Sequence, residues 1–221
     1  MEEKKIGIIF DMDGVLLDSM QVWDKAGIWY LERKGKVPEK NLSEIIFAMT
    51  MKEGADYLIK HYQLDESNED VIEGINQTIE HFYQFDAQLK PGVLEFLKKA
   101  NKLQIPMAIA TSTDKKLALA ALKRLQILPF FKQVFSCSEF KEGKTSPEIY
   151  LMAMQTIGTE VSNTWVVEDS LYASKTAKKA GFLVMGIYDE FSKKNEEALR
   201  SLCDGYLYEL LWDEKLWRII D

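Results

Sequence analysis

The sequence predicts an α/β fold, with a Rossmann-like parallel sheet core and an inserted all-helical domain. Two observations predict it. Short apolar runs alternate with helical patterns along residues 87–221, and such alternation requires a parallel sheet with helices on both faces. Residues 19–86, in contrast, show only helical patterns and directly follow a first strand at 6–10. We therefore predict a core of 1–18 and 87–221, interrupted by a helical insert of 19–86.

The first strand, 6–10, is apolar at four of its five positions, which is typical of a strand buried on both faces. The chain turns polar where it leaves the sheet, at Asp11 and Asp13, and Gly14 permits a tight turn there. Ligands bind at the carboxyl ends of strands in open α/β sheets. Two carboxylates at that place could hold a divalent cation or divide nucleophile and acid/base roles. Asp-x-Asp-Gly is also an ordinary turn, and this stretch alone leaves both interpretations open.

The insert contains three predicted helices. The first begins after an N-cap at Asp18 or Ser19, and a break at 34–38 separates it from the second. The apolar positions at helical spacing are Val22, Trp23, Ala26, Trp29 and Tyr30 in the first helix, Ala55, Leu58, Ile59 and Tyr62 in the second, and Val71, Ile75, Ile79, Phe82 and Phe85 in the third.

From Pro91 onward, helices and strands alternate. The predicted helices are 93–102, 114–126, 148–157, 171–180 and 192–202, and the predicted strands are 106–110, 133–137, 164–167, 182–187 and 205–208. Gly181 suits the position just after a helix end. The aromatic tail 212–220 predicts a terminal helix packed on the core.

Composition excludes several classes of function. With 221 residues, of which 47% are apolar and 29% charged, the chain can form a sizeable core, as one domain or one domain with an insert. A net charge of −7 argues against nucleic acid or anionic membranes as partners. No apolar stretch reaches membrane-spanning length, and two isolated cysteines, Cys137 and Cys203, suit a reducing cytoplasm. We expect a cytoplasmic monomer.

Three further predicted strands end in reactive polar groups or lead into them. Because the carboxyl ends of parallel strands meet at one edge of a sheet, these groups can lie near Asp11 and Asp13 despite their distance in sequence. The groups are Thr111 and Ser112 after one strand, Lys144 in the loop after the next, and Glu168 and Asp169 after a third. Taken singly they could be a strand-end hydroxyl, a solvated lysine and acids at a helix N-terminus.

Together these residues resemble the motifs of the haloacid dehalogenase-like superfamily of phosphotransferases. The motifs are Asp11-Met-Asp13-Gly-Val, Thr111-Ser112, Gly143-Lys-Thr-Ser-Pro-Glu-Ile-Tyr150 and Glu168-Asp169-Ser170, in the family's order. The resemblance covers essentially the whole chain. An all-helical insert between the first two motifs is similar to the cap of the branch that includes β-phosphoglucomutase and many small-metabolite phosphatases.

The resemblance implies a role for each motif residue. Asp11 would be the nucleophile that forms an aspartyl-phosphate, and Asp13 would protonate the leaving oxygen and then activate water. Thr111, the Ser112 amide and Lys144 would hold the phosphoryl oxygens. Mg2+ would be bound by Asp11, the backbone carbonyl of Asp13 and Asp169, together with Glu168.

The expected activity is therefore that of a Mg2+-dependent phosphatase for a small phosphorylated metabolite, which the sequence does not name. A phosphomutase is the alternative, but the mutase's cap histidine aligns with Trp23, and Lys52 is the nearest match to its cap arginine. We expect Trp23 and Lys52 to contact substrate, although cap packing and a surface charge explain them equally well. A phospho-accepting module would lack the insert, and a silent phosphate-binding protein would more readily have lost one of the polar groups.

Overall fold

The computed structural model describes residues 6–47, 49 and 51–212. The chain forms two compact units, one of Met1–Asp18 and Ala87–Asp221 and the other of Ser19–Asp86. We call them the core unit and the helical unit, and describe each by itself. Within the described residues, no helix is both long enough and apolar enough to cross a membrane.

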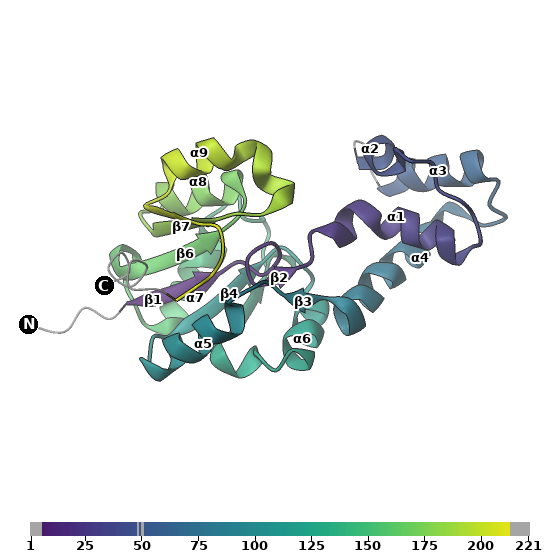
Figure 1. Ribbon diagram of the computed structural model, residues 1–221. Helices are drawn as coiled ribbons and strands as arrows, with labels where there is room; N and C mark the ends of the chain where they lie inside the picture. The colour runs from purple at the N-terminus through teal and green to yellow at the C-terminus, as the bar shows by residue number, and fades with distance from the viewer. Residues whose placement is uncertain (1–5, 48, 50, 213–221) are drawn as a thin grey trace, which may run out of the picture. The chain divides into compact units, whose positions relative to one another are not determined.

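The core unit is built on a six-stranded parallel sheet with β1 near its centre, in the order β5-β4-β1-β6-β7-β8 (Figure 1). Ile9 of β1 lies opposite Ala108 of β4 and Val166 of β6. The strands are β1 (Gly7–Phe10), β4 (Met107–Thr111), β5 (Val134–Ser136), β6 (Thr164–Glu168), β7 (Leu183–Ile187) and β8 (Gly205–Leu207). The predicted parallel α/β fold is confirmed.

Alternate residues of β1 pack on opposite helical layers, which explains why all four are apolar or glycine and fully buried. Ile9 belongs to a core cluster with α7 (Glu148–Ile157) and α8 (Leu171–Lys179). Phe10 packs its ring edge-on against Phe96 of α5 (Val93–Lys102), with 5.9 Å between ring centroids.

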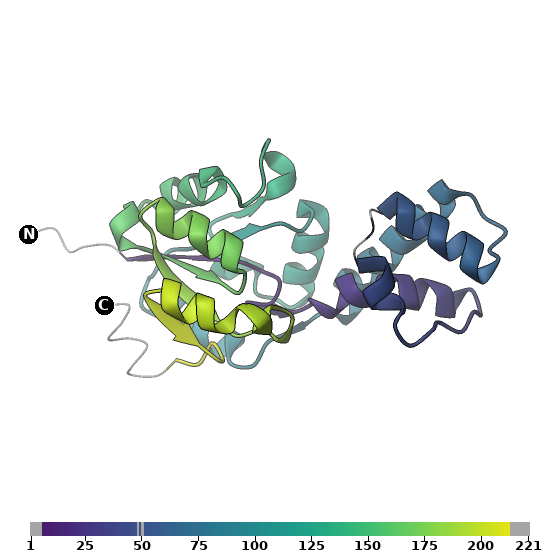
Figure 2. The ribbon, with the colours of Figure 1, turned by 90° about the horizontal axis from the view of Figure 1, so that it is seen from above.

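The remaining core helices are α6 (Lys115–Arg124) and α9 (Glu196–Leu202), and α8 and α9 lie side by side (Figures 1 and 2). The prediction of one helix over 192–202 is wrong in part, because a 3-10 turn at Glu190–Asn195 precedes α9. Gly181 follows α8 with φ of +94°, as predicted for a helix end. Apart from Trp212, the predicted terminal helix of 212–220 lies outside the described residues.

A short antiparallel pair joins the two places where the chain leaves and re-enters the core unit. In it β2 (Leu17–Asp18) pairs with β3 (Gln88–Leu89). The sequence did not predict this pair, because two residues are too few to show an alternating pattern. Within the core unit, β2 directly adjoins the turn that carries Asp11 and Asp13, since Asp13 forms an isolated bridge with Leu17.

The helical unit consists of α1 (Gln21–Arg33), α2 (Leu42–Phe47), α3 (Met51–Tyr62) and α4 (Asn68–His81), which continues into a π-helical turn at Phe82–Asp86. The predicted N-cap at Asp18 or Ser19 is wrong: α1 has Met20 at this position, without a side-chain cap, because Asp18 is still paired in β2. The sequence also missed α2, which is shorter than two turns.

Candidate active site

The first site residues follow β1, where the chain leaves the extended conformation. The Asp11 amide still donates to the Val167 carbonyl of β6, at 2.9 Å. The amides of Leu16 and Leu17 then both donate to the Met12 carbonyl, and Gly14 adopts φ of +76°. This left-handed residue closes a tight turn that a non-glycine residue would adopt only with strain. The turn buries the side chains of both Asp11 and Asp13.

Lys144 is buried between two carboxylates. Its Nζ lies 2.6 Å from Asp11 Oδ1 and 2.6 Å from Glu168 Oε1, and its side chain is only 2% exposed. Burial alone would lower the pKa of Lys144, but Asp11 and Glu168 outweigh it and raise this pKa above its ordinary value. Lys144 is therefore not a solvated loop lysine but a fixed positive charge beside Asp11.

Glu168 is held by groups from three segments of the core unit. Its Oε1 accepts from Lys144 and from the Tyr150 hydroxyl at 2.9 Å, and its Oε2 accepts from the Ser170 hydroxyl at 3.0 Å. These bonds orient the Glu168 carboxylate, and the bond from Lys144 to the oriented carboxylate fixes the position of the Lys144 ammonium group.

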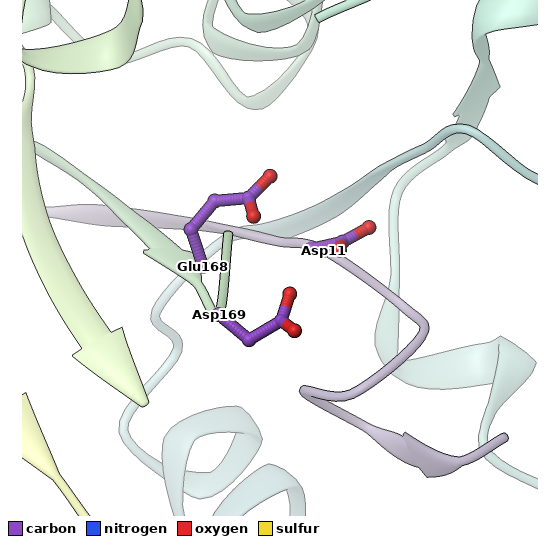
Figure 3. A group of neighbouring side chains, drawn as sticks. All are labelled: Asp11, Glu168 and Asp169. Carbon is purple, nitrogen blue, oxygen red and sulfur yellow. The ribbon is translucent and has the colours of Figure 1, made fainter. Parts of the chain in front are cut away.

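Asp11, Glu168 and Asp169 form a buried acidic cluster at the ends of the neighbouring strands β1 and β6 (Figure 3). One carboxylate oxygen from each lies within 4.8 Å of the other two. Burial raises the pKa values of Asp11 and Asp169, and the negative charge of Glu168 raises them further. Lys144 opposes this shift but does not cancel it. An all-oxygen set with excess negative charge fits a hard divalent cation.

The side chain of Asp13 is not one of these three acids but lies beside them, at the end of β4, where its charge adds to the raised pKa of Asp11. Its Oδ2 accepts a hydrogen bond from Thr113 Oγ1 at 2.7 Å, and Thr111 Oγ1 lies 3.4 Å from the same oxygen. The Thr113 amide in turn donates to Thr111 Oγ1, at 3.0 Å. The Thr113 hydroxyl therefore orients the Asp13 carboxylate, and the Thr113 amide fixes Thr111 Oγ1 beside it.

Ser112 is exposed beside Thr111, and its hydroxyl lies 3.8 Å from Cys137 Sγ and next to Tyr172, in the first turn of α8. The pKa of Tyr172 is raised mainly by burial, with contributions from the charges of Glu168 and Asp11. The structure thus brings together the core residues that the sequence singled out: Asp11, Asp13, Thr111, Ser112, Lys144, Glu168 and Asp169.

Trp23 and Lys52 belong to the helical unit. Trp23 lies in the first turn of α1 and is 48% exposed, and it lines a pocket of about 280 Å³ whose other walls include Met51 and Leu58. Lys52 is exposed in the first turn of α3, and its backbone carbonyl accepts from Asn68 Nδ2 at 3.0 Å. Their contact with substrate stays a prediction.

Sequence reasoning missed two groups that the site uses. Thr113 lies closer to Asp13 than Thr111 does. The sequence could have indicated Thr113, because both threonines are polar residues at the end of the same strand. Tyr150 is the last residue of the Gly143–Tyr150 motif and lies in the first turn of α7. Its hydroxyl is buried and therefore needs a hydrogen-bond partner, which is Glu168.

Comparison with known proteins agrees with this geometry. Residues 8–187 match the model of the haloacid dehalogenase-like hydrolases. The chain is 30% identical to a phosphorylated carbohydrates phosphatase of Thermotoga maritima, over 79% of this chain and 81% of the relative, and 28% identical to hexitol phosphatase A of Escherichia coli, over 82% of each.

A crystal structure from Thermotoga maritima, provisionally assigned as a beta-phosphoglucomutase, has the same fold. Its TM-score is 0.80 and its sequence identity 26%, over 97% of this chain and 96% of that one. The family match covers the β1 turn, the ends of β4 and β6, and the loop that carries Lys144. The chain therefore belongs to the haloacid dehalogenase-like hydrolases, in the branch of the phosphatases and phosphomutases.

Proposed function

We propose that this protein is a Mg2+-dependent phosphatase that hydrolyses a small phosphorylated metabolite, of the phosphorylated carbohydrate class, through an aspartyl-phosphate. One observation carries the proposal: Lys144 is buried against Asp11 at 2.6 Å, beside the acidic cluster and the separately held Asp13. This arrangement supplies a nucleophile, an acid/base and positive charge for a phosphoryl group. The names of the phosphatase relatives support the substrate class.

In the first step a carboxylate oxygen of Asp11 attacks phosphorus, and the bond from phosphorus to the substrate oxygen breaks. Asp13 gives its proton to that leaving oxygen. In the second step Asp13 takes a proton from water, the water oxygen attacks phosphorus, and the Asp11–phosphorus bond breaks. Phosphate leaves and both aspartates return to their starting states. The Thr113 bond to Asp13 suits this role, because it fixes one carboxylate oxygen and orients the other.

Positive charge and hydrogen-bond donors would hold the phosphoryl oxygens during transfer. We assign this role to the ammonium of Lys144, the hydroxyl of Thr111 and the amide of Ser112. Asp11, Asp169, the Asp13 carbonyl and Glu168 would hold Mg2+, directly or through water, and the ion would neutralise charge on the phosphoryl group.

We also propose that the helical unit, Ser19–Asp86, is a cap that selects the substrate. Trp23→Ala or Lys52→Ala is then expected to raise KM for the best substrate about fivefold, because each variant loses one contact worth about 1 kcal/mol. The thermal midpoint should stay nearly constant. Lys60→Ala is the matched control, an exposed lysine at the other end of α3. An unchanged KM and substrate profile in both variants would show that Trp23 and Lys52 only pack the unit.

A phosphomutase is the second candidate, because the chain shares its fold with the Thermotoga maritima structure provisionally assigned to that activity. The two activities differ in their product. A phosphatase releases inorganic phosphate in amounts equal to the substrate consumed, whereas a mutase returns an isomeric sugar phosphate. Incubation with a hexose 1-phosphate, followed by assays for both products, separates them.

A screen of phosphorylated sugars, nucleotides and cofactors at fixed Mg2+ tests the proposed function. We expect phosphate release, fastest from a sugar phosphate. Absence of release from every compound, an aryl phosphate included, would contradict it. The net charge of −7 further supports a protein without nucleic acid or anionic membrane partners, and we propose a cytoplasmic monomer.

A further inference from the structure

Lys90 joins three segments of the core unit around the turn that carries Asp13. It directly follows β3, and its side chain is 14% exposed. Its Nζ donates to the Gly14 carbonyl at 2.7 Å, to the Tyr188 carbonyl at 2.8 Å and to Asp189 Oδ2 at 2.9 Å. All three hydrogens of the ammonium group therefore have partners.

The bond to Gly14 matters because Gly14 is the residue after Asp13. The backbone of Lys90 holds the same turn, since its amide donates to the Leu16 carbonyl at 2.9 Å. The Gly14 amide in turn donates to the Leu17 carbonyl, so the turn is closed on itself and tied to Lys90. One residue thus fixes the turn through both its backbone and its side chain.

The bonds from Lys90 to the Tyr188 carbonyl and to Asp189 attach this turn to the segment that follows β7. Both residues follow β7, at the carboxyl edge of the sheet where the acidic cluster lies. Asp189 is 6% exposed, and its other oxygen accepts from the Phe191 amide at 3.0 Å. A nearly buried carboxylate requires a partner of opposite charge, and Lys90 supplies it.

We propose that Lys90 is a positioning residue for the acid/base step: it clamps the Asp13–Gly14 turn to the end of β7, so that the Asp13 carboxylate meets the leaving oxygen of the substrate. This inference rests on the proposed phosphatase function. Loss of the clamp allows the turn to move, whereas Asp11, Lys144 and the acidic cluster keep their contacts with one another. Because the turn also carries the Asp13 carbonyl, a proposed Mg2+ ligand, all variants are compared at saturating Mg2+. A shift of about 1 Å in a catalytic group can cost up to about a hundredfold in rate.

The test uses two variants, because Lys90→Met alone would leave Asp189 buried and unpaired. In the second variant, Lys90→Met with Asp189→Asn, that unpaired charge is removed while the Gly14 tether stays absent. For each protein, kcat/KM is measured with a hexose phosphate and with para-nitrophenyl phosphate. The value of kcat/KM reports the steps up to phosphoenzyme formation. In these steps only the sugar, which is a poor leaving group, needs a proton from Asp13.

We expect the double variant to lose about tenfold or more in kcat/KM for the hexose phosphate and less than about threefold for the aryl phosphate. The matched control is Lys178→Met with Asp204→Asn, which removes a partly exposed lysine–aspartate pair elsewhere in the core unit. The control should leave the ratio of kcat/KM for the hexose phosphate to kcat/KM for the aryl phosphate unchanged.

An equal loss for both substrates, or no loss for either, would show that Lys90 is only a structural residue, while the wild-type activity would still uphold the phosphatase function. If the wild-type protein hydrolyses neither substrate, the proposed function fails and the positioning role fails with it.

Discussion

Asp11→Asn is expected to reduce phosphate release from every substrate to background, a loss of at least about 10⁴-fold, because an amide cannot take over nucleophilic attack on phosphorus. The fold should persist, since asparagine has the same shape as aspartate and can still accept a hydrogen bond from the Met12 amide. Steady-state kinetics and the thermal midpoint check the two parts of this prediction.

Asp13→Asn is expected to fail differently. It keeps the nucleophile, and the hydrogen bond to Thr113 can be made by the amide oxygen. Turnover should fall by about 10² to 10⁴, because general acid–base catalysis contributes that much. Asp65→Asn, an exposed aspartate in the helical unit, is the matched control and should behave as wild type. Equal residual turnover in the Asp13 and Asp65 variants would remove Asp13 from the mechanism.

Chelation of divalent cations is expected to have an effect as large as that of Asp11→Asn: activity should fall to background and return with Mg2+. Without the cation, Asp11 and Asp169 either keep protons, which makes Asp11 a poor nucleophile, or ionise and repel a phosphate dianion, because Lys144 alone offsets only part of the negative charge of the cluster. Full activity in excess chelator would contradict the proposed metal site. Asp204→Asn, remote from the cluster, should need no more Mg2+ than wild type, whereas Asp169→Asn should need much more.

The pKa shifts give this prediction a pH dependence. Burial raises the pKa values of Asp11 and Asp169 in the metal-free protein, so these groups retain protons that the cation must displace. Mg2+ binding should therefore release protons, and the apparent affinity should rise with pH through the raised pKa values. Calorimetric titration in two buffers of different ionisation enthalpy measures the protons released. Proton uptake on binding would contradict this sign.

The sequence allowed the candidate site residues to be grouped, but not their hydrogen-bond partners to be named, and the reason is geometric. Residues at the carboxyl ends of parallel strands must lie at one edge of the sheet, so Asp11, Thr111 and Glu168 could be grouped from their order alone. Nothing comparable marks Lys90, whose side chain bonds to residues 76 and 99 positions away in the chain. Such contacts depend on loop conformation, which no periodic pattern encodes.

The same contrast holds for the secondary structure. Strands β4, β6 and β7 coincide with short, mostly apolar runs, and they could be located within about one residue. The β2–β3 pair and α2 are too short to show a period. The start of α1 was misplaced because Asp18, a good N-cap by residue type, is held in a strand by its pairing with Gln88.

The central claim is that Asp11 carries the phosphoryl group, and trapping that intermediate tests it most directly. The Asp13→Asn variant should react with para-nitrophenyl phosphate, whose leaving group needs little protonation, and then stall because the second step lacks its base. After an acid quench, intact mass should show one added phosphoryl group, and peptide mapping should place it on Asp11. Adding Asp11→Asn to this variant should abolish the label. A label that persists in the double variant, or that maps to Ser112 or Thr111, would contradict the account.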